Sequence, residues 1–257
     1  MADGDSKAAR RNSDLPVRTA TALVMVAVAG SAVWLGGWAW ALFVAAVACG
    51  VLWEWRSLAS RFAGSPARLG LWNVFGFVYI AVAAGTLLVL RSQLFPVWSV
   101  LAVLLAVIAT DIGAYFAGRA IGGPKIAPKI SPSKTWAGLG GGMVGASLVM
   151  LGLFALNDYA LTRGMDAVIV PTGQTGFWQS VDWAEALASA LPLGAVTAIV
   201  AQAGDFFESW MKRRAGVKDS GKLLPGHGGL FDRVDGLLSV CFVGGLGALA
   251  AMGLGLA

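Results

Sequence analysis

Charged residues are scarce in this sequence. They make up 13% of its 257 residues, whereas hydrophobic residues make up 57%; a soluble domain normally carries about 25% charged and about 45–50% apolar residues. This balance excludes a water-soluble enzyme and a disordered chain. Cysteine is equally rare: Cys49 and Cys241 both lie in apolar stretches, which excludes a disulfide-stabilised secreted module and a cysteine-based metal site. The thirty-five glycines, by contrast, suit closely packed membrane helices.

Long apolar runs dominate what is present. A bilayer core takes about 20 apolar residues as a helix, and the sequence predicts seven such segments, at 18–36, 38–54, 70–90, 97–118, 137–156, 183–204 and 234–256. We therefore expect an all-α, polytopic integral membrane protein. Residues 1–15 are polar and are expected to form a disordered cytoplasmic tail, ahead of a single transmembrane domain over 16–257.

Lysine and arginine are distributed unevenly among the connecting segments. If the N-terminus is cytoplasmic, 17 of the 19 basic residues fall in the cytoplasmic pieces, which are 1–18, 55–69, 119–136 and 205–233. Only Arg91 and Arg163 lie on the other side, with the 157–182 loop. The positive-inside rule therefore predicts a cytoplasmic N-terminus and cytoplasmic basic loops, in a cell (inner or plasma) membrane.

Acidic residues are few, so their positions are informative. Asp111 lies within the fourth apolar segment, where an insertion cost of about 2.5–3.5 kcal/mol implies that it lines a cavity or has a partner. Function is the preferred interpretation. The alternative is that Asp111 reaches the surface or pairs with Arg119 near the cytoplasmic end of that segment.

A second group of acids lies in residues 205–235. Asp205, Glu208 and Ser209 share one face if the sixth helix continues, and Asp232 and Asp235 are three residues apart where the seventh should begin. If the two groups converge, two carboxylates 4 Å apart repel each other by about 4 kcal/mol, and a cation or protonation must relieve this repulsion. Oxygen ligands favour magnesium. The alternative for Asp232 is a helix cap.

Glycines and basic residues lie between these two groups in the sequence. Gly226, Gly228 and Gly229 free the backbone to turn closely around an anion, and His227 lies among them. With Lys218 and Lys222 nearby, the pattern predicts a polyphosphate site. The alternative for the basic residues alone is contact with anionic lipid.

The 119–136 loop repeats this chemistry. Lys134 and three hydroxyl residues, Ser131, Ser133 and Thr135, precede a predicted helix start, where hydroxyl and ammonium donors bind phosphate readily. For Ser133 and Thr135, a capping role is an equally good interpretation of this stretch alone.

At these residues the sequence resembles the bacterial CDP-diacylglycerol synthases, that is, the phosphatidate cytidylyltransferases. Their signature is filled without a gap from Ser209 to Asp235, by the residues Ser209, Met211, Lys212, Arg213, Lys218, Asp219, Gly221, Pro225, His227, Gly228, Gly229, Asp232, Arg233 and Asp235. The stretches 110–119, 131–136 and 53–55 are also similar. Ala137 stands where family members often have glutamate, and members have eight or nine helices, so we expect about seven to nine.

The resemblance implies transfer of CMP from CTP to phosphatidic acid, which gives CDP-diacylglycerol and pyrophosphate. It implies a catalytic domain with motif loops 111–136 and 205–235 at the cytoplasmic side. Asp205, Asp232 and Asp235 would hold Mg²⁺, with room for a second cation, and Ser209, Lys218 and His227 would lie close to the reaction. The implied substrate-binding residues are Asp111, Ser131, Ser133, Lys134, Thr135, Lys212, Arg213, Lys222, Gly228, Gly229 and Arg233.

The resemblance also suggests a homodimer, and we expect no nucleic-acid partner because the basic residues lie in membrane-flanking loops. Two other functions compete with this one. A CTP-dependent lipid kinase would phosphorylate a lipid and release CDP, and the complete signature argues against it. A transporter is disfavoured because the sequence lacks an inverted repeat and the carboxylates cluster near the membrane surface.

Overall fold

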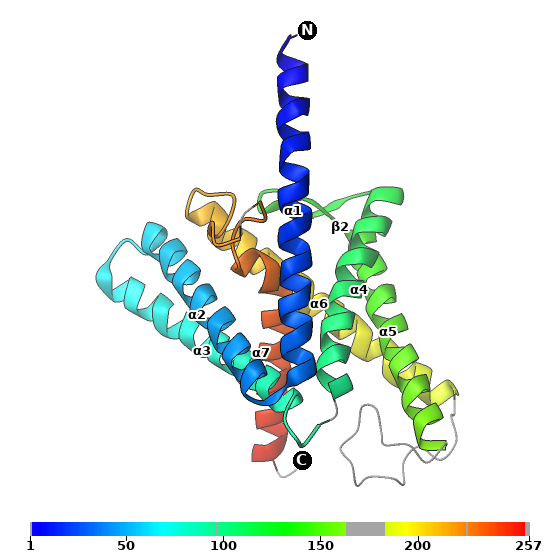
Figure 1. Ribbon diagram of the computed structural model, residues 1–257. Coiled ribbons are helices and arrows are strands. Elements are labelled where there is room, and N and C mark those ends of the chain that lie inside the picture. Colours follow the sequence, from blue (N-terminus) through cyan, green and yellow to red (C-terminus); the bar gives the residue numbers. More distant parts are fainter. Residues whose placement is uncertain (1, 96, 163–182, 225, 255–257) are drawn as a thin grey trace.

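The computed structural model describes residues 2–95, 97–162, 183–224 and 226–254. Within these residues, seven helices follow one another, with two short strands between the fourth and the fifth (Figure 1). The elements are α1 (Ala2–Leu35), α2 (Gly37–Phe62), α3 (Pro66–Leu90), α4 (Val97–Ala120), β1 (Lys125–Ala127), β2 (Ser131–Thr135), α5 (Trp136–Thr162), α6 (Trp183–Arg214) and α7 (Phe231–Gly253).

Each of the seven helices in the described ranges contains a stretch long and apolar enough to cross a membrane. Large apolar side chains remain exposed along every helix, as contact with lipid requires. The predicted all-α, polytopic membrane fold is therefore confirmed, with the lower of the predicted helix numbers.

Several helix boundaries differ from the predicted ones. α6 continues past residue 204 to Arg214, and α7 begins at Phe231 rather than at 234, because polar residues on one helix face can meet the protein interior. α1 begins at Ala2, so the structure has helical backbone where the sequence predicts a disordered tail over 1–15. Alanine, lysine and arginine in that stretch are strong helix formers. Residues 163–182 of the predicted 157–182 loop lie outside the described residues.

The 119–136 loop contains a short β-hairpin that the sequence analysis did not predict. β1 and β2 pair antiparallel, with Lys125 opposite Thr135 and Ala127 opposite Ser131. Gly122 and Gly123 precede β1 with φ of 68° and 91°, a backbone conformation that glycine adopts readily. The hairpin leads directly into α5 and so fixes the approach of Lys134 and Thr135 to the helix bundle.

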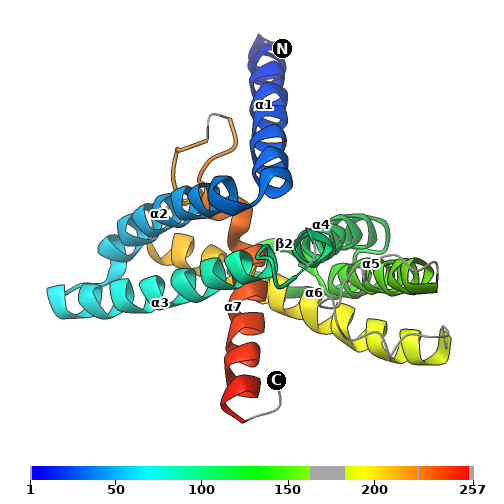
Figure 2. The same cartoon turned by 60° about the horizontal axis from the view of Figure 1, so that its bottom comes forward.

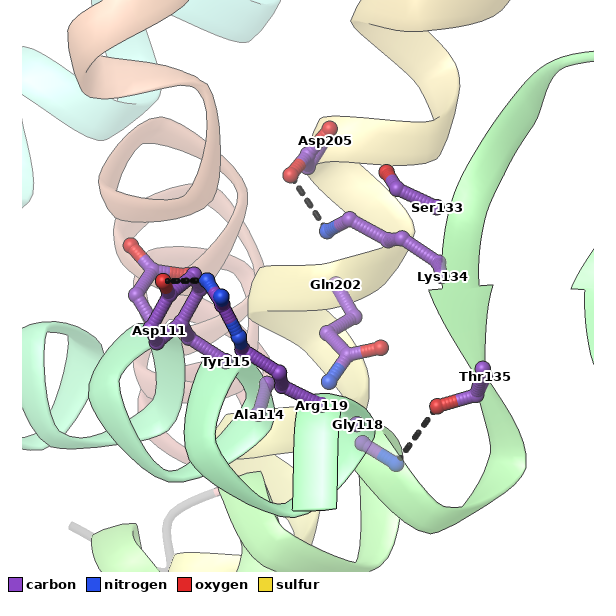
Figure 3. Close-up of a pocket in the computed structure, with 11 residues that line it drawn as sticks. Asp111, Ala114, Tyr115, Gly118, Arg119, Ser133, Lys134, Thr135, Gln202 and Asp205 are labelled. Carbon is purple, nitrogen blue, oxygen red and sulfur yellow. Dashed lines mark hydrogen bonds and ion pairs between the residues drawn. The ribbon is translucent and has the colours of Figure 1, made fainter. Parts of the chain in front are cut away.

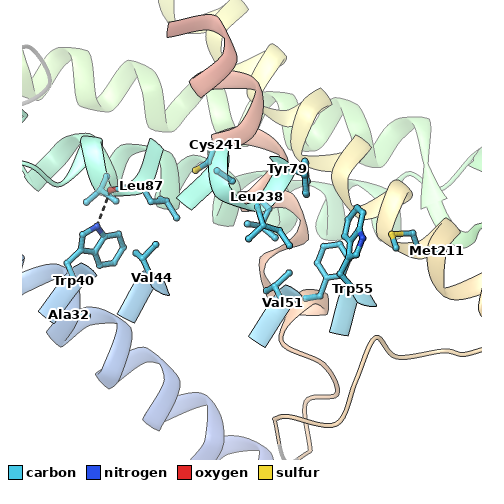
Figure 4. Close-up of a cluster of buried hydrophobic side chains, with 14 of the residues drawn as sticks. Ala32, Trp40, Val44, Val51, Trp55, Tyr79, Leu87, Met211, Leu238 and Cys241 are labelled. Atoms are coloured by element: carbon cyan, nitrogen blue, oxygen red, sulfur yellow. Dashed lines mark hydrogen bonds between the residues drawn. The ribbon is translucent and has the colours of Figure 1, made fainter. Parts of the chain in front are cut away.

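The largest buried cluster extends from Ala32 and Trp40 to Met211, and Trp55 of α2 lies towards its Met211 end (Figure 4). Its ring lies 5.9 Å from that of Tyr79 on α3, 5.7 Å from Phe207 on α6 and 5.8 Å from Phe231 on α7. Its indole N–H also donates to the carbonyl oxygen of Trp72 (2.9 Å). Aromatic packing of this kind joins four helices beside the polar end of α6.

The helices form two groups, which Figure 2 shows on opposite sides of α7. α2 and α3 pack together on one side and α4 and α5 on the other, while α6 packs against both α5 and α7. α4 and α5 cross closely, since a Cβ at Gly113 or Gly141 would collide with the carbonyl oxygen of the other residue. The hairpin and the loop before α7 lie at the same end of the bundle (Figure 1).

Candidate active site

A cavity of about 470 Å³ opens between α4, the hairpin, α5 and α6 (Figure 3). Its lining combines carboxylates, cations, hydroxyls and glycines, contributed by Asp111, Ala114, Tyr115, Gly118, Arg119, Ser133, Lys134, Thr135, Gly138, Gln202 and Asp205. Five of these residues (Asp111, Ser133, Lys134, Thr135 and Asp205) were candidates from the sequence. The structure therefore brings the 119–136 loop and the end of the sixth apolar segment into one site.

Lys134 and Asp205 form an ion pair within this cavity (Figure 3). The Asp205 carboxylate also accepts a hydrogen bond from the Ser209 hydroxyl (3.4 Å), one turn along α6. Asp235 of α7 lies within electrostatic reach of Asp205, Lys134 and Asp111. Asp111 of α4 and Asp235 of α7 are therefore in electrostatic contact with the Lys134–Asp205 pair, in which Asp205 binds the ammonium directly.

Asp111 lines the cavity, in line with the preferred interpretation of that residue. Arg119 does not serve as its counter-ion here, since its guanidinium donates to the Tyr115 hydroxyl (2.8 Å). The hydroxyl residues of the hairpin divide between the two roles left open by the sequence. The Thr135 Oγ1 accepts the backbone N–H of Gly138 (3.0 Å) and so caps α5, although Thr135 also lines the cavity. Ser133 lies on the cavity wall.

Lys212 forms the centre of a second polar cluster. Its ammonium pairs with Glu208 one turn earlier on α6 and with Asp232 of α7, at 2.6 Å from Asp232 Oδ1. Glu208 is fully buried and the other two side chains are nearly so. A buried ion pair requires further hydrogen bonds to offset its desolvation, and Asp232 has them.

Asp232 organises the loop before α7. Its Oδ2 accepts hydrogen bonds from the Ser220 N–H (2.9 Å) and the Gly229 N–H (3.0 Å), and it lies 2.9 Å from the Ser220 hydroxyl oxygen. The N-cap of α7 is Leu230, so Asp232 is not the cap residue that the alternative interpretation expected. It ties the loop to α6 instead, through Lys212.

The glycine-rich loop turns as predicted. Gly226 and Gly228 have φ of 75° and 84°, and the Leu224 N–H donates to the Gly228 carbonyl oxygen (3.0 Å). Arg233 binds this turn from the first turn of α7, since its guanidinium donates to the His227 carbonyl oxygen at 3.1 and 2.5 Å. The buried His227 Nδ1 has no hydrogen-bond partner in the described part of the chain.

Other predicted site residues lie away from these two clusters. Lys218 and Lys222 are exposed on the loop, and Ser131 is half-buried at the start of β2. Arg213 is exposed and donates to the Ile130 carbonyl oxygen (3.3 Å), which ties α6 to the hairpin. Their roles at the site stay predictions.

Several residues that the structure brings to the site were not among the site residues predicted from the sequence. Tyr115, Arg119 and Gln202 line the cavity, and Glu208 completes the Lys212 cluster. Glu54 of α2 binds the glycine-rich loop. Glu54 carried a usable signal, because a carboxylate is rare inside an apolar segment.

The arrangement fits the predicted magnesium ligands in part. Asp205 and Asp235 lie on adjacent helices and influence each other electrostatically, so both stay candidates for ligands of one ion. Asp232 does not fit as found, because both its oxygens accept hydrogen bonds from Lys212, Ser220 and Gly229. Among the described residues, no group of three or more His, Cys, Asp or Glu side chains is arranged to hold a metal ion.

Comparison with known proteins gives the family. The sequence model of the family described as "Cytidylyltransferase family" matches residues 66–244. A phosphatidate cytidylyltransferase of Brucella suis biovar 1 (strain 1330) is 33% identical over 88% of this chain and 90% of its own length. Proteins of the same name from Rickettsia bellii (strain RML369-C) and Pseudomonas aeruginosa (strain PAO1) are 28% and 29% identical, over 89% and 87% of this chain and 88% and 93% of their own lengths. The chain therefore belongs to the cytidylyltransferase family.

Proposed function

We propose that this multi-pass membrane protein transfers CMP from CTP to phosphatidic acid, giving CDP-diacylglycerol and pyrophosphate. Relatives named for this reaction match the chain over most of its length. The observation that carries the proposal is the cavity in which the Lys134–Asp205 ion pair lies beside Ser133 and Arg119. Such a mixture of cations, hydroxyls and carboxylates suits a phosphate ester and its counter-ion.

The reaction joins a phosphatidate oxygen to the α-phosphorus of CTP and breaks the bond between that phosphorus and the oxygen leading to the β-phosphate. Negative charge then gathers on the departing pyrophosphate, and fixed cations lower the barrier most at that point. Lys134 in the cavity and Lys212 in the neighbouring cluster are the cations best held for this role. Lys218 and Lys222, which are exposed, would meet the nucleotide as it arrives.

The lipid substrate can keep its acyl chains in the bilayer. Tyr115 and Phe116, on the α4 turn beside the cavity, are 57% and 65% exposed, and such side chains offer an apolar wall next to a polar opening. A phosphatidate headgroup could enter the cavity while its chains lie against this wall. This division suits a reaction between a soluble nucleotide and a membrane lipid.

We propose further that the reaction requires magnesium. Asp205 and Asp235, with the Asp205 ion pair to Lys134 opened, are the residues that would hold it, and the ion would supply charge stabilisation at the phosphates when bound. Asp232 was also predicted as a ligand and would first have to release Lys212. The same proposal includes a second cation, a homodimer, a location in the inner or plasma membrane, and catalytic loops on the cytoplasmic side of that membrane.

The test uses CTP labelled with ³²P in the α- or the γ-phosphate, mixed with phosphatidic acid and the purified protein in detergent micelles. Thin-layer chromatography should show α-label in a lipid product and γ-label only in pyrophosphate. Lipid carrying the γ-label would indicate a lipid kinase and would contradict the proposal. The absence of labelled lipid with either nucleotide would indicate a transporter or another non-enzymatic role.

A further inference from the structure

Glu54 of α2 accepts hydrogen bonds from the segment that contains the glycine-rich loop, although the two lie far apart in the sequence. Its side chain is 3% exposed. Glu54 Oε2 accepts the Ser220 hydroxyl (2.8 Å) and the Phe231 N–H (2.8 Å), and Oε1 accepts the Leu230 N–H (3.0 Å). All three donors belong to the segment that leads into α7.

The Glu54 carboxylate caps the N-terminus of α7. The first N–H groups of a helix lack partners within the helix and carry a partial positive charge. The N-cap residue, Leu230, has no side chain that could accept them. Glu54 accepts the N–H groups of Leu230 and Phe231 from another helix, and these donors in turn offset the cost of burying its charge.

One hydroxyl group links Glu54 to the second polar cluster. Ser220 Oγ lies 2.8 Å from Glu54 Oε2 and 2.9 Å from Asp232 Oδ2. Asp232 in turn holds Lys212. A chain of contacts therefore runs from α2 through the loop to α6, and it fixes the positions of both Asp232 and Lys212.

The glycines of the loop provide a second, independent observation. A Cβ at Gly221 or Gly229 would fall in the space of the Glu54 carboxylate, and at Gly229 it would also collide with the Ser220 hydroxyl. The loop thus lacks side chains where Glu54 approaches it. This close approach brings the Gly229 N–H to Asp232 (3.0 Å).

We propose that Glu54 is a positioning residue of the active site. It holds Ser220 and residues 229–231 in the conformation in which Asp232 fixes Lys212, so that Lys212 is positioned for the substrate phosphates. The proposal rests on the proposed function for the identity of the reaction, but the positioning itself does not depend on it. Glu54 lies outside the segment matched by the family model, which begins at residue 66.

The experiment compares Glu54→Gln, which removes the charge at nearly constant volume, with Trp40→Phe as the matched control. Trp40 is a buried residue of the same helix, and its indole N–H donates to the Leu87 carbonyl oxygen (3.0 Å) far from the loop. For each variant, kcat and KM for CTP, the thermal unfolding midpoint and amide hydrogen exchange are measured in the full-length protein.

For Glu54→Gln we expect kcat to fall about tenfold or more with KM changed less than about threefold, since small misplacements of reacting groups are costly. Exchange should rise in the 218–231 peptide and stay unchanged elsewhere. Glu54→Asp should recover part of kcat, because it keeps the charge. Ser220→Ala, a smaller change, should lower kcat in the same direction. Trp40→Phe should lower the unfolding midpoint and leave kcat as in the parent.

A parent-like kcat and exchange pattern in Glu54→Gln would overturn the proposal. An equal loss of kcat in Trp40→Phe would do the same, because it would assign the loss to general destabilisation. If the parent protein makes no CDP-diacylglycerol, the proposed function fails, and the exchange measurement still decides whether Glu54 holds the loop. If the parent is active and exchange in 218–231 is unchanged by Glu54→Gln, the positioning role alone fails.

Discussion

At the scale of single residues, Lys134 has the most direct claim on the substrate. Its ion pair with Asp205 is partly exposed, and ion pairs of that kind contribute about 0–1 kcal/mol to stability. The same ammonium beside a phosphate in a cavity contributes far more to a transition state. Charge at residue 134 should therefore matter for turnover and little for folding.

We accordingly predict that Lys134→Met lowers kcat/KM at least about 100-fold and shifts the thermal unfolding midpoint only slightly. Lys129→Met is the matched control, since Lys129 is an exposed lysine at the tip of the same hairpin. Steady-state kinetics and thermal unfolding of the two variants check this. Equal kinetic losses in both would reduce Lys134 to one member of a diffuse basic surface.

For Gln202 we predict that a substitution keeps or raises stability while it weakens substrate binding. Its side chain is 4% exposed, and its amide nitrogen has no hydrogen-bond partner among the residues that the structure describes. A buried donor without a partner costs about 1–3 kcal/mol, and a substrate oxygen in the cavity would satisfy it. Gln202→Leu should keep or raise the unfolding midpoint while raising KM for CTP or phosphatidic acid about fivefold or more. A lower midpoint with unchanged KM would contradict this.

The sequence indicated several of the residues that form the cavity, but not which of them pair with one another. Asp232, within the family signature, and Asp205, just before it, carried a strong signal. Their lysine partners, Lys212 and Lys134, depend on how α6 and the hairpin pack. Gln202 gave no signal, because a single amide at the end of an apolar segment is common. Contacts between distant segments are set by tertiary packing, which residue spacing along one helix does not encode.

At the scale of elements, α6 and the loop before α7 show why some predictions succeeded. The spacing of Asp205 and Ser209 required a continuing helix, and α6 does continue to Arg214. Gly226 and Gly228 were expected to let the backbone turn closely, and both have positive φ. The hairpin was missed because Lys125–Ala127 and Ser131–Thr135 are too short and polar for a strand pattern.

The loop offers a test at this scale. Gly229→Ala should lower activity at least about tenfold, because the added Cβ collides with the Ser220 hydroxyl and crowds Glu54. Gly244→Ala, in the middle of α7, is the control, since a Cβ there meets nothing within 4 Å. Activity assays on both variants, with expression and unfolding midpoints alongside, check this. Comparable activity in the two variants would show that the loop tolerates displacement by a methyl group.

At the scale of the whole molecule, the distribution of basic residues agrees with the arrangement of the helices. The hairpin and the loop before α7, two of the predicted cytoplasmic segments, lie at one end of the bundle, and the 91–95 turn lies at the other (Figure 1). The seven apolar runs of the sequence correspond to the seven long apolar helices of the described residues, so run length alone located them. The order of the helices around α7 could not be predicted, because hydropathy does not distinguish the apolar face of one helix from that of another.

The predicted orientation can be tested with single cysteines in a Cys49→Ala, Cys241→Ala background. Lys222→Cys and Gln93→Cys both replace exposed residues. The loop before α7 and the 91–95 turn, to which they belong, lie at opposite ends of the bundle. In intact cells a membrane-impermeant maleimide should label position 93 and spare position 222 until the membrane is opened. Labelling of position 222 in intact cells would reverse the orientation.

The central claim is that phosphatidate attacks the α-phosphorus of CTP, and oxygen labelling tests it most directly. Phosphatidic acid with ¹⁸O in its phosphate is converted by the purified protein, and both products are weighed by mass spectrometry. The account predicts that CDP-diacylglycerol keeps the ¹⁸O, including the atom that bridges its two phosphorus atoms, and that pyrophosphate carries none. Heavy oxygen in pyrophosphate, or a doubly phosphorylated lipid without cytidine formed together with CDP, would contradict the account.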